Sequence, residues 1–591
     1  MLQLTMVINN RPILTENILK MKITAKHFYR SFLFGLLVLM AFPAISQNKT
    51  YNEEVTVVAP YEPAIADASK INLTPEISLP KPETPTLNYS IRSFLVPTFF
   101  QVEPIKPANI AGETLPELTK GYVKGGLGNY FTPYLEAFYN SLRTNEYAWG
   151  AHLMHLSDNG KINDYSKSTN SLNQLDVYGK KFFTNKTMVS GEMGFSRRMV
   201  HFYGFHPDDF LGQPSKGDLR QRFALFNASA GFQSDNPEPS ALNYSSNISF
   251  YYFADRFKTG ETNLKISGAG VKDFRLFDFT KMQSIGLEAQ WDYYHNSDSL
   301  SKYYNAILTI KPYISTIFND FTFKAGLNPV IETGDVSKFH LYPVAKVQLK
   351  VLDEVLLVEA GIDGGLQRNS YKEITTDNPF VNSDVTLKNT SNTFKIFAGV
   401  KSRLANDIDL QASISSASLK NQPFFITDTV NVYKNRFLAV YDDVNLFNIH
   451  AEGAYHMGDK ITMTLNADFF HYSMDKLSKP WNCPDFKFSY SAKYKFLEKF
   501  VATADIYAWT KTYVRDYRWV LYNDFLPEEP QIEDIKTING AVDANLGLEY
   551  RYSKKISGFV NLNNILNTKY FQYYNYPSQR FNFLLGATYS F

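Results

Sequence analysis

The stretch FNFLLGATYSF, residues 581–591, ends the chain and decides its fold. Apolar and aromatic side chains alternate in it with polar or small ones, apart from Leu584. This is the period of a β-strand with lipid on one face and a water-filled lumen on the other. A terminal aromatic strand of this kind is typical of an outer-membrane barrel, so we predict that Tyr589 and Phe591 belong to the strand that closes the barrel. The apolar positions are Phe581, Phe583, Leu585, Ala587, Tyr589 and Phe591.

The same alternation recurs upstream, for example over residues 542–551, 461–469 and 284–291. A charged side chain on the lipid face at the middle of a bilayer costs about 2–4 kcal/mol. We therefore expect the charged residues of the predicted strands to face the lumen, either as a hydrated, partly paired lining or as a selective permeation path. They are Glu136, Glu288, Asp292, Asp468, Asp505, Asp543, Glu549, Arg551 and Arg580.

Short polar turns and longer connections follow one another from residue 118 to the C-terminus. Short periplasmic turns and long outer loops are the usual asymmetry of outer-membrane barrels. Ten turns and eleven outer connections join 22 strands, so we predict an all-β fold, a transmembrane antiparallel β-barrel of about 22 strands over residues 118–591. The turns are expected near 143–146, 184–186, 235–240, 278–281, 318–320, 352–354, 406–407, 458–460, 497–499 and 553–555, and the long connections at 158–170, 199–218, 370–390, 420–438, 474–482 and 513–537.

The N-terminal region contains a pattern typical of a targeting segment. The apolar run from Phe32 to Phe42 is too short to cross a bilayer as a helix, is preceded by basic residues and is followed by small ones. This pattern predicts a secretory signal peptide within residues 1–46, cut near Ser46, with Met21 as the more suitable start and residues 1–20 as a mis-set one. We expect the mature chain in the outer membrane of a diderm bacterium.

Residues 47–117 differ from the rest because ten prolines fall between Pro60 and Pro116. Proline cannot donate a hydrogen bond to a sheet, so this segment is predicted to be extended, with little core of its own. The formal net charge of +2 gives no reason to expect a nucleic-acid partner. Cys483 is the single cysteine and excludes an internal disulfide.

The C-terminal region, residues 561–591, resembles the end of TonB-dependent receptors, whose barrels have about 22 strands. A second stretch resembles the segment by which such receptors couple to an energised inner-membrane partner: Glu54, Val55, Thr56, Val57, Val58 and Ala59. There an extended strand adds to the edge of a partner sheet through main-chain hydrogen bonds. The resemblance implies outer-membrane lipids, a TonB-type coupling protein, a surface lipoprotein and the barrel-assembly machinery as partners.

The chain also departs from that family. Its relatives carry a globular plug between the coupling segment and the first strand, whereas about 60 proline-rich residues follow Ala59 here. The sequence is therefore compatible with two functions. One is a receptor that imports or passes a solute through the outer membrane; the other is a non-transporting barrel subunit of an outer-membrane assembly or secretion complex.

Two outer connections supply candidate residues for binding a ligand or a partner. The first, residues 199–219, places Tyr203, His206 and Asp208 among further aromatic side chains. Imidazole and carboxylate could together hold a divalent metal, but no tight ligand spacing is present, and a packed aromatic loop is the simpler interpretation. The second connection, residues 513–537, sets aromatic rings beside arginines, which suits stacking on sugars or on a protein partner. Its candidates are Arg515, Tyr517, Arg518 and Trp519.

No catalytic pattern stands out. The sequence holds no GxSxG elbow, no phosphate-binding P-loop, no HExxH and no paired-cysteine metal site. His152 and His155 lie on one predicted strand, but no nucleophile can be assigned to them. We therefore predict a protein that is not an enzyme and that needs no cofactor or metal.

Overall fold

A computed structural model describes residues 119–591, except 143, 185, 211–213, 216, 235–237, 239–240, 276–281, 299–301, 335, 353–354 and 519–531. All of these residues belong to one compact unit, Ile110–Phe591. The predicted signal peptide, the proline-rich segment and the coupling segment Glu54–Ala59 lie outside the described residues. Within the described part, no helix is long and apolar enough to cross a membrane.

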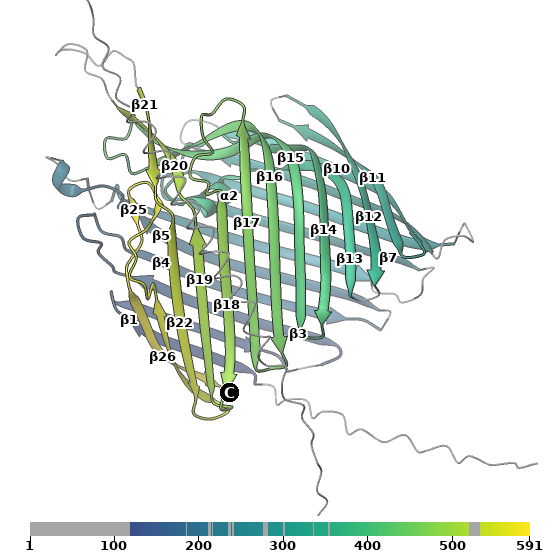
Figure 1. The fold of residues 1–591 in the computed structure, drawn as a ribbon, viewed down its shortest axis with the longest axis horizontal. Coiled ribbons are helices and arrows are strands. Elements are labelled where there is room, and N and C mark those ends of the chain that lie inside the picture. Colours follow the sequence, from purple (N-terminus) through teal and green to yellow (C-terminus); the bar gives the residue numbers. More distant parts are fainter. Residues whose placement is uncertain are drawn as a thin grey trace, which may run out of the picture. The chain divides into compact units, whose positions relative to one another are not determined.

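The protein is a closed antiparallel barrel of 22 strands (Figure 1), which confirms the predicted fold class and strand number. Each strand pairs with its sequence neighbours, and the first pairs with the last. The barrel strands are β1 (Gly121–Gly128), β2 (Thr132–Asn140), β3 (Tyr147–Asp158), β4 (Asn170–Phe182), β5 (Thr187–His201), β6 (Arg220–Ser234), β7 (Leu242–Asp255), β8 (Gly260–Phe274), β9 (Met282–Ser297), β10 (Lys302–Phe318), β11 (Phe321–Thr333), β12 (Lys338–Leu352), β13 (Leu356–Gln367), β14 (Thr390–Ala405), β15 (Ile408–Thr427), β16 (Phe437–Met457), β17 (Ile461–Met474), β18 (Phe486–Phe496), β19 (Phe500–Trp509), β22 (Ala541–Arg551), β23 (Ile556–Asn563) and β26 (Asn582–Ser590).

The barrel closes between β1 and β26, as the terminal aromatic strand predicts. The register runs from Tyr122 opposite Ser590 to Gly128 opposite Leu584. At the end of the seam, Gly121 and Phe591 exchange both backbone hydrogen bonds, each at 2.9 Å. Closure matters because an open sheet edge in lipid would leave its N–H and C=O groups without partners.

Glycine makes this seam possible at one position in particular. A Cβ atom on Gly586 would stand 2.1 Å from the carbonyl oxygen of Gly125 and 2.5 Å from the ring of Phe559. The backbone of β1 cannot move away from such a contact without breaking its hydrogen bonds to β26. By contrast, a Cβ atom on Gly125 itself would meet nothing within 4 Å.

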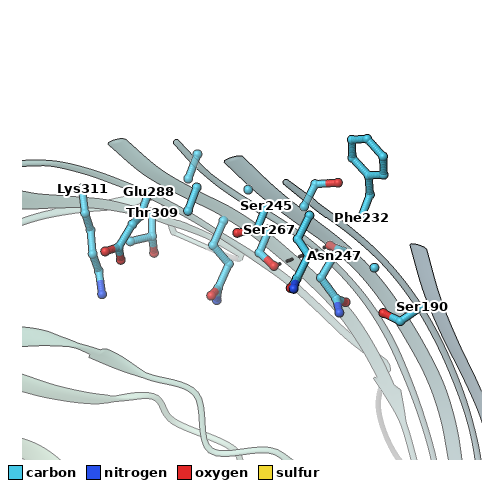
Figure 2. A pocket seen from close by; sticks show the side chains of 15 residues that line it. Ser190, Phe232, Ser245, Asn247, Ser267, Glu288, Thr309 and Lys311 are labelled. Atoms are coloured by element: carbon cyan, nitrogen blue, oxygen red, sulfur yellow. Dashed lines mark hydrogen bonds between the residues drawn. The ribbon is translucent and has the colours of Figure 1, made fainter. Parts of the chain in front are cut away.

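The two faces of the wall divide as the alternation predicts. Leu585 and Tyr589 of β26 remain about half exposed on the outside, as do Ile285 and Leu287 of β9. Figure 2 shows the wall between β5 and β10, where Lys311, Glu288, Asn247 and Ser190 point to the concave side, while Phe232 points to the convex side. The outer surface is therefore apolar and the lumen is polar.

The two ends of the barrel also differ. All ten predicted short turns are confirmed, and their connections are two to seven residues long. They gather at one end, here called the turn end, and the other eleven connections form the loop end (Figure 1). Four of the longer connections contain structure of their own: the short 3-10 helix η2 (Pro207–Asp209), α2 (Tyr371–Asp377), the hairpin β20 (Thr512–Arg518) with β21 (Ile532–Ile538), and the hairpin β24 (Phe571–Tyr573) with β25 (Tyr576–Pro577).

The seam yields a stability prediction. We expect Gly586→Ala to reduce the yield of closed barrel strongly, because the added methyl group collides with the opposite backbone. The measurement is the folded fraction after refolding into detergent, scored by circular dichroism and by resistance to protease. Gly125→Ala, on the facing strand, should fold like the wild type; equal folding of both variants would contradict this account of the seam.

Candidate functional site at the loop end

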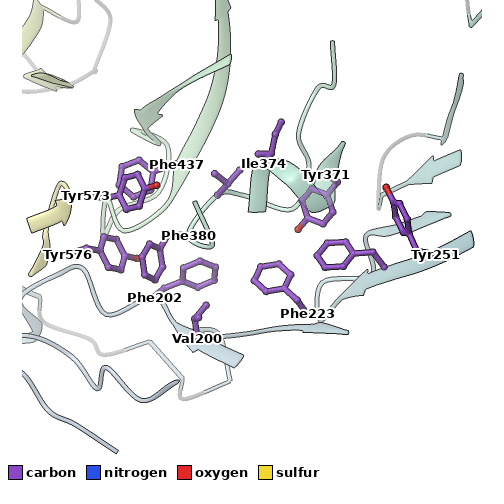
Figure 3. Close-up of a cluster of buried hydrophobic side chains, with 12 residues drawn as sticks. Val200, Phe202, Phe223, Tyr251, Tyr371, Ile374, Phe380, Phe437, Tyr573 and Tyr576 are labelled. Carbon is purple, nitrogen blue, oxygen red and sulfur yellow. The ribbon is translucent and has the colours of Figure 1, made fainter. Parts of the chain in front are cut away.

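A buried aromatic core lies across the loop end of the barrel (Figure 3). Its members come from strands and connections that are far apart in sequence and around the wall. Several are completely buried, with Val381 and Phe437 at 0% exposure. We call this group the mouth core; it comprises Val200, Phe202, Phe223, Tyr251, Phe253, Tyr371, Ile374, Phe380, Val381, Phe437, Tyr573 and Tyr576.

The central element of the mouth core is the connection 368–389 between β13 and β14, here called the lid segment. It contains α2, which begins with a capping box: Ser370 accepts a hydrogen bond from the Glu373 amide, and Glu373 accepts one from the Ser370 amide, both at 3.1 Å. The helix ends at Asp377, just ahead of Asn378 and Pro379. A residue before proline avoids the helical conformation, so the helix stops there.

On one side, the lid segment is fixed to β7 and β8 by two carboxylates, the half-buried one of Asp255 and the fully buried one of Glu261. Asp255 accepts hydrogen bonds from the Tyr371 hydroxyl at 2.9 Å and from the Ser383 hydroxyl. Glu261, which is fully buried, accepts one from the Tyr371 amide at 2.7 Å and one from the Tyr251 hydroxyl at 2.5 Å. Burial, and next the charge of Asp255, raise the pKa of Tyr371 well above its usual value, so its hydroxyl stays a donor.

Arg368 and Thr259 complete this attachment. The Arg368 guanidinium donates to the Tyr251 hydroxyl at 2.9 Å and lies 3.7 Å from an Asp292 oxygen. The Thr259 hydroxyl donates to the Ser383 carbonyl at 3.0 Å. Because buried carboxylates are costly unless they are well hydrogen-bonded, these bonds hold the lid segment in one position.

On the opposite side, the lid segment meets β16 and the β24–β25 hairpin. Val381 pairs with Phe437 at the start of β16, and the ring of Phe380 stacks on Tyr576 with centroids 3.7 Å apart. The Tyr573 hydroxyl donates to the carbonyl of Asp377 at 2.5 Å. The lid segment therefore reaches across the loop end from the β7–β8 wall to the β16 wall.

The structure of the lid segment was not anticipated from the sequence, which predicted only a long connection at 370–390. A local signal was present. Ser370 and Glu373 have the S-x-x-E spacing of a capping box, and Pro379 follows at a distance that ends a short helix. The contacts with β7, β16 and β24, in contrast, have no signature in the sequence.

A cavity of about 610 Å³ adjoins the mouth core, between the β3–β5 wall and the connection 564–581. Pro379 and Phe380 of the lid segment form part of its boundary. Because amide side chains dominate its lining, we call it the amide cavity. The amides are Asn170, Asn545, Asn563, Asn564, Asn582, Gln572 and Gln579.

Polar groups in the amide cavity keep free capacity for a ligand. Asp543 accepts from the Tyr570 hydroxyl at 2.9 Å, but its second oxygen, Oδ1, is buried without a partner, as is the Ser578 hydroxyl. Burial, followed by Asp543, raises the pKa of Tyr570 to about 12. Arg198 adds a cation that is not ion-paired within the described chain. Such a lining suits a polar ligand rich in hydrogen-bonding groups.

The candidate residues of the connection 199–219 do not form one site. Tyr203 lies against the mouth core, where its hydroxyl donates to the Pro577 carbonyl at 2.9 Å, and burial raises its pKa. His206 lies on the outer side of that connection, with Nδ1 2.7 Å from the Asp164 carbonyl oxygen. Asp208 lines a separate outer cavity. The predicted role of these residues in ligand binding stays a prediction.

The candidates of the connection 513–537 lie on or beyond the hairpin β20–β21. Arg515 is half-buried on β20, while the side chains of Tyr517 and Arg518, and all of Trp519, lie outside the described residues. The neighbouring Asp516 fixes the hairpin to the loop end through an ion pair with Lys434 at 2.8 Å. A second ion pair of Asp516, with Lys536 of β21 at 2.5 Å, lies within the hairpin. The hairpin is thus attached to the β15–β16 connection.

The lumen below the mouth core contains several polar pairings. His152 lies 3.3 Å from both Glu136 and Asp176, and His450 lies 2.8 Å from Asp468. No group of three or more His, Cys, Asp or Glu residues in the described part of the chain has the geometry of a metal site. Burial raises the pKa of the Cys483 thiol to about 11, so it is a poor nucleophile near neutral pH.

Comparison with known proteins concerns the fold. No protein-family model and no curated protein matches the sequence. Among solved structures, the barrel is similar to FpvA of P. aeruginosa bound to pyoverdines (TM-score 0.60, 11% identity, 80% of this chain and 72% of the other). It is also similar to the siderophore receptor PirA of Acinetobacter baumannii (0.59, 10%, 81% and 81%) and to the FrpB iron transporter of Neisseria meningitidis (0.59, 10%, 81% and 82%). The predicted resemblance to this kind of receptor is confirmed for the barrel, and no enzyme is among these matches.

One substitution on the wall should loosen the attachment of the lid segment. We expect Asp255→Asn to destabilise the lid segment by about 1–3 kcal/mol, because an amide group replaces an acceptor that faces several donors. Hydrogen exchange of residues 371–383 should become faster while that of the barrel strands stays unchanged. Asp505→Asn, a lumen position whose carboxylate bonds Ser491 at 2.6 Å, is the control. Unchanged exchange in the Asp255 variant would show that this carboxylate does not hold the lid.

Proposed function

We propose that the chain is an outer-membrane receptor that passes a polar solute through its lumen, with the lid segment as a gate. The mouth core carries this proposal. An apolar outer wall and a polar lumen suit a barrel in the outer membrane, with its loop end outside. A barrel of 22 strands has a lumen that needs a plug. Here the chain's own connections close it at the loop end.

The energy of the mouth core bears on how such a gate would work. Burying one large apolar side chain contributes about 1.5–3 kcal/mol, and the mouth core buries twelve residues. Opening would therefore need either a ligand that replaces these contacts or an external source of energy. A coupling segment at Glu54–Ala59, which engages an inner-membrane partner, would supply the second, and the signal peptide cut near Ser46 would deliver the chain to the membrane.

The amide cavity is the place where we propose that the solute is held. It lies beside Phe380 of the lid segment, so occupation of the cavity can bear directly on the position of the lid. Its open hydrogen-bonding groups at Asp543 and Ser578 suit a ligand with hydroxyl or amide groups. PirA is a siderophore receptor and FrpB an iron transporter; we assign neither ligand to this chain.

A second candidate function is a permanently sealed barrel that serves as a subunit of an outer-membrane complex. The observation in its favour is the completeness of the mouth core, whose lid segment is fixed on both sides. A barrel of this kind would present its loops and the hairpin β20–β21 to partners and would never open. The two functions differ in one respect only, which is whether the lid segment moves.

A reversible disulfide across the lid attachment tests whether the lid segment moves. Thr259 and Ser383 are in hydrogen-bond contact across the lid attachment, and Thr259→Cys with Ser383→Cys would join them by a disulfide. The native Cys483 is only partly exposed and the pKa of its thiol is raised, so it should react slowly. If the chain is a gated receptor, the oxidised variant should fail to restore the phenotype of a strain that lacks the protein, and a reductant should return function.

Each single-cysteine variant is the matched control: it loses a lid hydrogen bond but cannot form the disulfide, so its activity should be the same under oxidising and reducing conditions. The double variant must also reach wild-type levels in the outer membrane. Full function of the oxidised double variant would refute the gate and favour the sealed subunit.

A further inference from the structure

Four arginines gather on the side of the barrel near the loop end, and none of them belongs to the mouth core. Arg197 and Arg222 alternate with residues that face inward, Val200 and Phe223 of the mouth core, so they point outward. Arg220 follows on the same face of β6. Arg256 begins the β7–β8 connection, and its guanidinium donates to the backbone carbonyls of Gly217 and Arg220. We call Arg197, Arg220, Arg222 and Arg256 the arginine band.

Among the residues that the structure describes, no carboxylate is ion-paired with the arginine band. Arg197, Arg220 and Arg256 are all close enough to repel the Arg222 guanidinium. None of the four takes part in an ion pair between residues that the structure describes, and the Nε atom of Arg220 is buried without a hydrogen-bond partner. Like charges held together in this way favour the binding of an anion.

The position of the band relative to the apolar surface indicates the kind of anion. On the same outward face of β5, β6 and β7, one or two positions closer to the middle of each strand, lie Phe195, Phe226 and Tyr252, each between 37% and 49% exposed. Aromatic rings of this kind mark the level of lipid headgroups in outer-membrane barrels. The band therefore stands just beyond the hydrocarbon, where a lipid carries its charged groups.

A cavity of about 850 Å³ continues the band toward the loop end. The connections 159–169 and 202–219 form it, and His201 and Arg220 join it to the wall. Its charged lining consists of Lys161, Lys167 and Arg220 against Asp164 and Asp208. Together with the band, it offers cations and space for a headgroup larger than a single phosphate.

We propose that the arginine band and this outer cavity bind the phosphorylated headgroup of a lipid of the outer leaflet. Arginine is suited to phosphate because its planar guanidinium makes two parallel hydrogen bonds. The acyl chains of the same lipid would lie on Phe195, Phe226 and Tyr252. The bound lipid would neutralise the band and brace the connections 159–169 and 202–219, of which the second supplies Phe202 to the mouth core.

Native mass spectrometry of the detergent-purified full chain tests the proposal. The probes are bis-phosphorylated lipid A, the same lipid without its phosphates, and inorganic phosphate. We expect wild-type protein to retain phosphorylated lipid A, and Arg197→Gln with Arg222→Gln to weaken its apparent affinity about tenfold or more. Arg197→Lys with Arg222→Lys, which keeps the charge, should retain most of the binding.

The charge-matched control is Lys302→Gln with Lys338→Gln, two exposed cations at the loop ends of β10 and β12. This control should bind as the wild type, and all variants should show the wild-type circular dichroism spectrum. The proposal is wrong if the glutamine variant binds lipid A as tightly as the control, or if the lipid without phosphates binds equally well. Displacement of lipid A by millimolar inorganic phosphate would also overturn it, because the site would then be one for free phosphate.

Discussion

Every backbone N–H and C=O group that faces lipid must find a partner within the protein, and the rest of this structure depends on that constraint. It requires a sheet without edges, and the pairing of β1 with β26 provides one. The seam tolerates this close approach because Gly586 has no side chain. With 22 strands the barrel is wide, and its own wall cannot fill its lumen.

The second problem, how to close so wide a lumen, is solved at the loop end by a core of the kind found in globular domains. Aromatic rings from β6, β7, β16 and two connections, together with Val200 of β5, pack around the lid segment. Two carboxylates on the wall, Asp255 and Glu261, give that apolar core a defined orientation, because each accepts hydrogen bonds only from donors in fixed places. If this segment is the gate that we propose, its packed core favours two distinct arrangements over a continuous range.

The sequence was sufficient to predict the barrel but not the mouth core. Alternation over residues 542–551 and 461–469, with short polar turns, predicts strand direction, strand number and the face that meets lipid. The mouth core obeys no such period, since its members lie in connections whose conformation depends on distant contacts, such as that of Phe380 with Tyr576. Tyr203 illustrates the limit: the sequence was compatible with a binding residue or with a packed aromatic loop, and only the structure shows its partly buried ring packed against the mouth core. The capping box at Ser370 was the one local sign of the lid segment.

The central claim is that the lid segment closes the lumen to the outside, and a labelling measurement tests it most directly. Ser267 faces the lumen from β8 (Figure 2), and Ser267→Cys can be probed on whole cells with a maleimide too large to cross the outer membrane. The account predicts no labelling while the lid segment is intact, and rapid labelling once residues 371–383 are replaced by a short glycine–serine linker. Equal labelling with and without the lid segment would contradict it.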